Sequence, residues 1–255
     1  MGIAKGILIA VLCVCLLALV FVGVTAAHNT KEMNSVIDAV LAEIRKHFDM
    51  KTVECGSYGT MKVSGMKFLV DQYKVNGIGN LCVMRVNIGI MQMVTLVLTS
   101  VERDLPLFSM DYMYMLGNRM SYLEFFDLVL DKGEKYQTFL SQIAGVRKSY
   151  DRIADKIPAS AWYDAYWTES IHKQGKKKDD AVLHEMAVKA VDVLMQYAES
   201  LPVLDEAAHT EKAKLQKIYS DGLVEQGGVS TDAFVKSLGK DATKKFFDEV
   251  MFKAE

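Results

Sequence analysis

One segment of the chain places an acidic residue in the middle of a predicted strand. Residues 107–115 read Leu-Phe-Ser-Met-Asp-Tyr-Met-Tyr-Met, and strand periodicity assigns Ser109, Asp111 and Met113 to one face. Aspartate is depleted in strands, and burial raises the pKa of a carboxyl group. A carboxylic acid that keeps its proton near neutral pH can donate it to a substrate, so Asp111 is the candidate catalytic residue. The alternative is a hydrogen-bonded or partly exposed aspartate without chemistry.

Methionines concentrate in the same part of the chain. They are Met84, Met91, Met93, Met110, Met113, Met115 and Met120. Methionine adapts to irregular apolar shapes, so these side chains are candidates for lining a pocket for a large flat ligand. Met113 is the candidate contact nearest to Asp111. The alternative is ordinary filling of the core.

Other common motifs of catalysis and metal binding are absent from the sequence. Residues 77–82 read Gly-Ile-Gly-Asn-Leu-Cys and fail the dinucleotide fingerprint at its last glycine. The sequence has no Walker loop and no Gly-x-Ser-x-Gly elbow. None of the five histidines falls in a predicted strand, and no two of them have the i, i+4 spacing of a helical metal site. They are His28, His47, His172, His184 and His209. We therefore expect no metal site.

The elements around Asp111 indicate an α+β protein. A helix with an apolar stripe is predicted from Asn29 to Phe48, with Asn29 and Glu32 at capping-box spacing. Five or six strands follow between residues 60 and 130 without a helix between them, which predicts an antiparallel meander. Helices then dominate to the end of the chain. The predicted architecture is an α/β/α sandwich, a central antiparallel sheet flanked by helices.

The first 28 residues are distinct from the rest. Residues 7–27 form an uncharged apolar run of about the length that a bilayer core requires. We favour a single-pass membrane anchor at residues 1–28, followed by one folded domain at residues 29–255. The alternative is a signal segment that is cleaved, which would make the protein secreted. Lysine and arginine are too evenly spread around the run to predict which side of the membrane the domain occupies.

Composition excludes several classes of protein. The net charge is −2, which argues against nucleic-acid binding through bulk positive charge. Two of the four cysteines lie in the apolar run, and Cys55 and Cys82 have no neighbour at metal-ligand spacing. A disulfide-dense scaffold and a cysteine-based zinc site are therefore not expected.

The segment that leads to Asp111 resembles a family signature. Residues 103–111 read Arg-Asp-Leu-Pro-Leu-Phe-Ser-Met-Asp, and the ferredoxin-dependent bilin reductases typically show D-x-P-x-F-G-x-D on a central strand. Asp104, Pro106, Phe108 and Asp111 match the signature, and Ser109 replaces its glycine. The tail at residues 238–252 is also similar to the closing helix of that family. Red chlorophyll catabolite reductase shares the same fold.

The resemblance implies a fold and an activity. It implies an α/β/α sandwich that binds a linear tetrapyrrole, such as biliverdin, between the sheet and the C-terminal helices. It implies no bound flavin or metal, and single electrons supplied by a ferredoxin-like donor. Asp111 would be the proton donor, and Ser121 a candidate contact for a propionate. Arg85 and Arg119 are further candidates for propionate binding, because guanidinium binds carboxylate through two hydrogen bonds.

One departure from the family concerns a histidine. Many members have a histidine on the preceding strand, about seventeen residues before the catalytic aspartate, and here that place holds Val94 and Thr95. Two other hypotheses stay open beside a membrane-anchored reductase. One is a tetrapyrrole carrier without chemistry, and the other is an unrelated anchored α+β protein.

Overall fold

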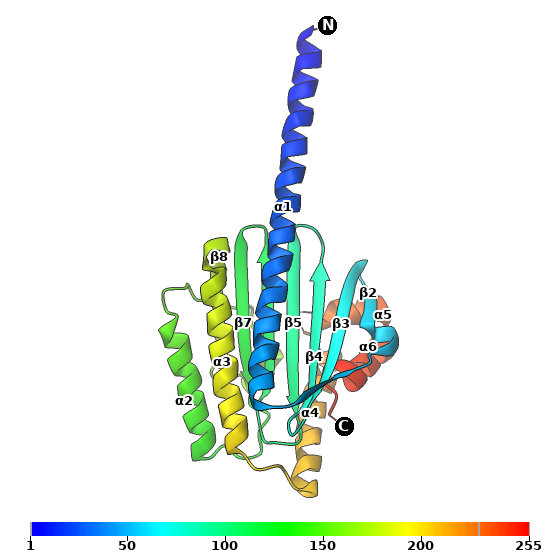
Figure 1. Ribbon diagram of the computed structural model, residues 1–255. Coiled ribbons are helices and arrows are strands. Elements are labelled where there is room, and N and C mark those ends of the chain that lie inside the picture. Colours follow the sequence, from blue (N-terminus) through cyan, green and yellow to red (C-terminus); the bar gives the residue numbers. More distant parts are fainter. Residues whose placement is uncertain (1, 229, 255) are drawn as a thin grey trace.

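A single antiparallel sheet lies between two layers of helices (Figure 1). The computed structural model describes residues 2–228 and 230–254, with side chains described for residues 16, 17, 19–228 and 230–254. The strands are β1 (Met50–Val53), β2 (Thr60–Val63), β3 (Met66–Val75), β4 (Gly79–Asn87), β5 (Met91–Ser100), β6 (Leu107–Met115), β7 (Asn118–Phe126) and β8 (Ile171–Lys176). The helices are α1 (Gly2–His47), α2 (Glu134–Ser149), α3 (Asp180–Ser200), α4 (Glu206–Gln226), α5 (Thr231–Leu238) and α6 (Lys240–Phe246). A π-helical turn, η4 (Phe247–Met251), follows α6.

The strand order follows the chain. The sheet runs β1-β3-β4-β5-β6-β7-β8, every pairing is antiparallel, and β2 also pairs with β3. The predicted meander and the predicted α+β class are therefore confirmed. Gly79 begins β4 at φ 154°, so close to β5 that a Cβ atom would collide with the carbonyl oxygen of Thr99. Gly77 and Gly79 thus form the turn and the first residue of the hairpin between β3 and β4.

Each face of the sheet has its own core. On one face α1, α2 and α3 pack on the strands, and the apolar stripe of α1 contributes side chains that are at most 5% exposed: Met33, Val36, Ile37, Val40, Leu41 and Ile44. On the other face the C-terminal helices and η4 bury a second cluster against β2, β3 and β4. Burial of each large apolar side chain contributes about 1.5–3 kcal/mol, which holds both layers to the sheet.

Helix α1 is continuous across the predicted boundary at residues 28 and 29. Asn29 therefore does not cap a helix, as the sequence suggested, and its side chain instead donates a hydrogen bond to the Leu116 carbonyl oxygen at 3.1 Å. The N-terminal part of α1 projects beyond the sheet (Figure 1). The apolar run at residues 7–27 lies partly outside the residues whose side chains are described. Within the part of the chain whose side chains are described, no helix combines the length and the hydropathy that a membrane span needs.

The first aspartate of the signature is a structural clamp. Asp104 is 8% exposed and accepts hydrogen bonds from the backbone N–H groups of Leu130 and Asp131 at 2.8–2.9 Å. The fully buried ammonium of Lys212, on α4, lies 3.1 Å from the same carboxylate and also donates to the carbonyl oxygen of Leu105. Burial lowers the pKa of Lys212 to about 8, against the opposing effect of Asp104. This ion pair links α4 to the loop before β6, the strand that carries Asp111.

Candidate active site on the sheet

Four polar side chains form a row across the sheet. Asp111 on β6 lies opposite Thr95 on β5 and opposite Tyr122 on β7, and Tyr122 lies opposite His172 on β8. Directly opposed residues of antiparallel strands share a face, so all four side chains point to the same side of the sheet. It is the side covered in part by the C-terminal helices.

The carboxyl group of Asp111 is held by two hydroxyl groups. Thr95 Oγ1 donates to one carboxylate oxygen, and Ser109 Oγ lies 3.3 Å from the other. Asp111 is half-buried. Burial, followed by the negative charge of Glu124, raises its pKa to about 7, while the hydrogen bonds from Thr95 and Ser109 act in the opposite direction. Asp111 is therefore protonated in part of the protein molecules at neutral pH, as proton donation requires.

A histidine–carboxylate pair lies beside Asp111. Glu124 is two residues beyond Tyr122 on β7, and its Oε1 lies 3.1 Å from His172 Nε2. The histidine ring is fixed between Tyr122 and Trp167, with ring centroids 5.2 Å away in each case. This corrects the sequence interpretation, which placed no histidine in the strands.

His172 escaped sequence analysis because β8 has almost no strand signal. Its six residues read Ile-His-Lys-Gln-Gly-Lys, and the segment before it is irregular. Only the pairing with β7 brings it to the site. Glu124 carried a weak signal, since it lies in the predicted strand after Asp111, but its face depends on the register between the two strands.

Aromatic side chains cover the same face of the sheet beyond this row, near the end of β7 and the start of β6. Tyr219 on α4 is buried against Phe126, with ring centroids 4.9 Å apart, and against Trp162 and Tyr166 from the short helical turn η2 (Trp162–Tyr166). Burial raises the pKa of the Tyr219 hydroxyl well above its usual value, and the charges of Glu124 and Asp111 add to this effect. The hydroxyl therefore stays protonated near both carboxylates.

Methionines continue the same face toward the opposite end of the strands. The members of this methionine surface are Met84, Met91, Met93, Met113, Met115 and Met120. Met84 is buried, four others are half-buried and Met115 is 38% exposed. Met110 instead points into the core beneath α1 and α3. The structure thus places Met113, as predicted, beside Asp111.

Three predicted binding residues lie on the other face of the sheet. Ser121 opposes Tyr112, whose hydroxyl donates to the Leu183 carbonyl oxygen of α3, so Ser121 is buried beneath that helix. Arg119 is 1% exposed and forms a bidentate ion pair with Asp180 of α3. Neither side chain lies with Asp111, because neighbouring residues of a strand point to opposite faces.

Arg85 is the third of these residues. It opposes Val94, which is buried in the core beneath α1, and its guanidinium forms an ion pair with Asp71 on β3. The structure therefore does not bring Arg85 to the Asp111 face.

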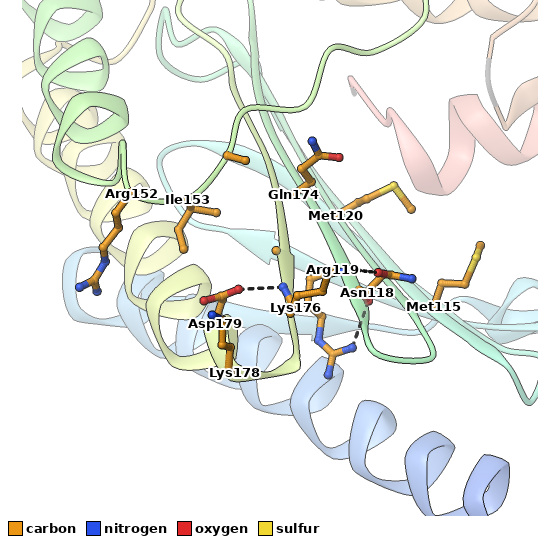
Figure 2. Close-up of a pocket in the computed structure, with 12 residues that line it drawn as sticks. Met115, Asn118, Arg119, Met120, Arg152, Ile153, Gln174, Lys176, Lys178 and Asp179 are labelled. Carbon is orange, nitrogen blue, oxygen red and sulfur yellow. Dashed lines mark hydrogen bonds between the residues drawn. The ribbon is translucent and has the colours of Figure 1, made fainter.

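Cations instead gather at the β8 edge of the sheet. A groove of about 640 Å³ lies there, and Figure 2 shows the residues that line it. Two of them, Met120 and Gln174, lie two residues along their strands from Tyr122 and His172 of the row that contains Asp111. Met115 and Met120 line it from the methionine surface. Positive charge comes from Arg119, Arg152, Lys176 and Lys178. A volume of this size is within the range of about 300–1,000 Å³ that is usual for ligand pockets.

Comparisons with known proteins support the fold. No family model matches the chain, and no curated protein matches it. Among solved structures, it is similar to selenomethionine-labelled phytochromobilin synthase from tomato, crystallised in complex with biliverdin, with a TM-score of 0.70 and 13% sequence identity. The similarity covers 87% of this chain and 83% of that one. The chain has the phytochromobilin synthase fold. Phytochromobilin synthase is a ferredoxin-dependent bilin reductase, so the resemblance predicted from residues 103–111 is confirmed as a distant one, at the level of the fold.

Proposed function

We propose that this protein reduces a linear tetrapyrrole and that Asp111 donates a proton to it. The observation that carries the proposal is the position of Asp111, a half-buried acid with a pKa of about 7 at the centre of a methionine-rich sheet face. The fold adds support, because phytochromobilin synthase was crystallised with biliverdin. Fold alone does not determine chemistry, so the proposal rests on the side chains.

The methionine surface suits a large flat ligand. Met93, Met113 and Met120 are half-buried, and their flexible side chains adapt to the outline of a conjugated ring system. A tetrapyrrole lying on them would extend toward the groove at β8. Its propionates would then meet Arg152 and Lys176. Arg119, suggested by the sequence, also lines this groove, although its guanidinium is paired with Asp180.

The reaction adds two electrons and two protons to the tetrapyrrole. A ferredoxin-type protein supplies the electrons one at a time, and the chain supplies the protons. After the first electron arrives, Asp111 transfers its proton to a carbon or to a lactam oxygen of the substrate. The resulting carboxylate is stabilised by the hydroxyl groups of Thr95 and Ser109. In this proposal the Glu124–His172 pair would deliver the second proton or return a proton to Asp111.

The test uses the full-length chain, biliverdin and a reduced ferredoxin system. We expect the visible spectrum of biliverdin to shift on binding and a product band to form on reduction. Asp111→Asn should bind with the same shift and form product about 100-fold more slowly or worse. Asp71→Asn is the matched control, because it makes the same substitution on the opposite face of the sheet.

The outcomes separate the hypotheses. Unchanged turnover in Asp111→Asn would contradict the proposal. Binding without reduction in the wild-type protein, with several electron donors, would favour a carrier. The absence of any spectral shift would contradict tetrapyrrole binding by this protein.

A further inference from the structure

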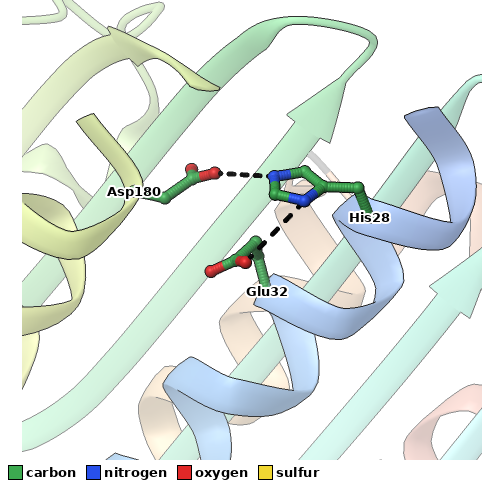
Figure 3. A group of neighbouring side chains, drawn as sticks. All are labelled: His28, Glu32 and Asp180. Carbon is green, nitrogen blue, oxygen red and sulfur yellow. Dashed lines mark hydrogen bonds and ion pairs between the residues drawn. The ribbon is translucent and has the colours of Figure 1, made fainter. Parts of the chain in front are cut away.

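Histidine and carboxylate side chains meet between α1 and α3, on the face of the sheet opposite Asp111. Figure 3 shows His28 and Glu32 on α1 facing Asp180, the first residue of α3. His28 Nε2 lies 3.3 Å from Asp180 Oδ2, and His28 Nδ1 lies 3.9 Å from Glu32 Oε1. One ligand atom from each residue can be chosen so that all lie within 4.8 Å of one another.

The spacing of these residues is that of a metal site built on two helices. His28 and Glu32 are four residues apart on α1, and Asp180 and His184 are four residues apart on α3. Residues at this spacing project from the same helical face. His184 Nδ1 lies 3.9 Å from Glu32 Oε2, which makes it a candidate fourth ligand. Zinc bonds of about 2.0–2.2 Å place tetrahedral N and O ligands about 3.4 Å apart. The ligand atoms of His28, Glu32 and Asp180 lie within 4.8 Å of one another, so side-chain rotation must bring them closer around an ion.

Buried groups hold two of these side chains in place from behind. Tyr114 Oη lies 3.2 Å from His184 Nε2, which leaves Nδ1 to face Glu32. Arg119 donates to both oxygens of Asp180 and fixes the plane of the carboxylate. Partners of this kind orient the ligands of known metal sites.

The cluster is open to solvent. His28, Glu32 and His184 are 29%, 21% and 14% exposed at their side chains, and they line a surface groove between the two helices. Lys177 and Lys178 line the same groove, and Arg119 lies behind it, so their positive charge weakens cation binding without blocking access.

We propose that His28, Glu32 and Asp180, with His184 as fourth ligand, bind a divalent transition-metal ion, Zn²⁺ by their chemistry. Neutral imidazole and carboxylate are the nitrogen and oxygen donors that Zn²⁺ takes. The ion would join α1 to α3, far from the proton chemistry on the other face, and would stabilise the fold. This inference is independent of the proposed function and revises the expectation that the protein has no metal site.

A second histidine cluster on the same two helices provides the control. His47 lies between Glu43, Asp192 and Glu199, with contacts of 3.0–3.7 Å. Two of its carboxylates pair with lysines, Glu43 with Lys46 and Asp192 with Lys189. In the first cluster Asp180 pairs with Arg119, whereas among the described residues Glu32 forms ion pairs only with histidines. We interpret that cluster as an ion-pair network, so His47→Ala removes a histidine of the same helix pair without removing the proposed ligands.

The experiment titrates the metal-free full-length protein with Co²⁺, followed by its visible absorption, and measures thermal unfolding with and without Zn²⁺. We expect one Co²⁺ per chain and a rise in Tm with Zn²⁺ in the wild-type protein and in His47→Ala. His28→Ala and the isosteric Glu32→Gln should weaken Co²⁺ binding about tenfold or more and abolish the rise in Tm. Circular dichroism without metal shows that the variants fold.

Two results would overturn the proposal. One is the absence of stoichiometric Co²⁺ binding to the wild-type protein. The other is binding and stabilisation in Glu32→Gln and His28→Ala equal to those of the wild-type protein, which would place the metal elsewhere.

Discussion

Thr95 and Asp111 face each other directly across β5 and β6, and the hydroxyl of Thr95 donates a hydrogen bond to the Asp111 carboxylate. The bond favours the charged form of the acid, while burial and the charge of Glu124 favour the neutral form. The balance leaves the pKa of Asp111 near 7. The hydroxyl group of Thr95 thus lowers the pKa of Asp111 against these two effects.

Removing this hydroxyl should raise the pKa of Asp111. Thr95→Val keeps the shape of the side chain and deletes the donor. We expect the alkaline limb of the pH–rate profile to move upward by roughly 0.5–1 pH unit, because Asp111 then keeps its proton to higher pH. Thr99→Val, at a buried position of the same strand and face, is the control and should leave the profile in place. A downward shift in Thr95→Val would contradict the assignment.

The raised pKa of Asp111 also predicts how stability depends on pH. The folded state binds the proton more tightly than the unfolded chain does, so this carboxyl group costs stability progressively as the pH rises from about 4 to about 7. Asp111→Asn removes the cost. Urea denaturation should show the variant gaining stability relative to the wild-type protein between pH 5 and pH 8, by up to about 3 kcal/mol. An equal difference at both pH values would mean that Asp111 is ionised throughout.

The clamp between Asp104 and Lys212 should control stability and not chemistry. Lys212→Met leaves the carboxylate of Asp104 buried without its cation, which costs about 3–5 kcal/mol of unfolding free energy. The double variant with Asp104→Asn should recover part of that loss, because the unpaired charge is then gone. Urea unfolding of the single and double variants measures the coupling. Additive losses would show that the two groups do not act as a pair.

Two neighbouring residues of β7 test which face binds the tetrapyrrole. Met120 lies on the methionine surface, and Ser121 lies beneath α3. We expect Met120→Ala to weaken biliverdin binding about tenfold, since it removes apolar contact area from the ligand. Ser121→Ala should leave the affinity unchanged. The reverse pattern, measured by absorbance titration, would place the ligand on the other face.

The sequence predicted the strand of Asp111 well because its alternation is strong. Residues 107–115 were predicted as a strand and form β6 with the same bounds, and the apolar stripe of α1 is equally clear. Both signals are local. The large apolar neighbours of Asp111 in the sequence indicated that it is half-buried. They did not indicate that Glu124, whose charge raises the pKa of Asp111, lies nearby.

The faces of the other predicted residues depended on register. The strand after Asp111, β7, begins at Asn118, directly after the short turn at Leu116 and Gly117. That turn fixes the register in which Tyr122 lies opposite Asp111. Ser121 and Arg119 therefore point to the opposite face of the sheet, beneath α3. His172 is a further case, because only long-range pairing of a polar edge strand brings it to the site.

The central claim is that Asp111 supplies a proton to a bound tetrapyrrole. The most direct test is the pH dependence of single-turnover biliverdin reduction by the full-length protein with a pre-reduced ferredoxin. The account predicts that the wild-type rate falls as the pH rises through about 7, and that Asp111→Asn loses both most of the rate and this dependence. A variant that keeps the wild-type rate and profile, while binding biliverdin normally, would contradict it.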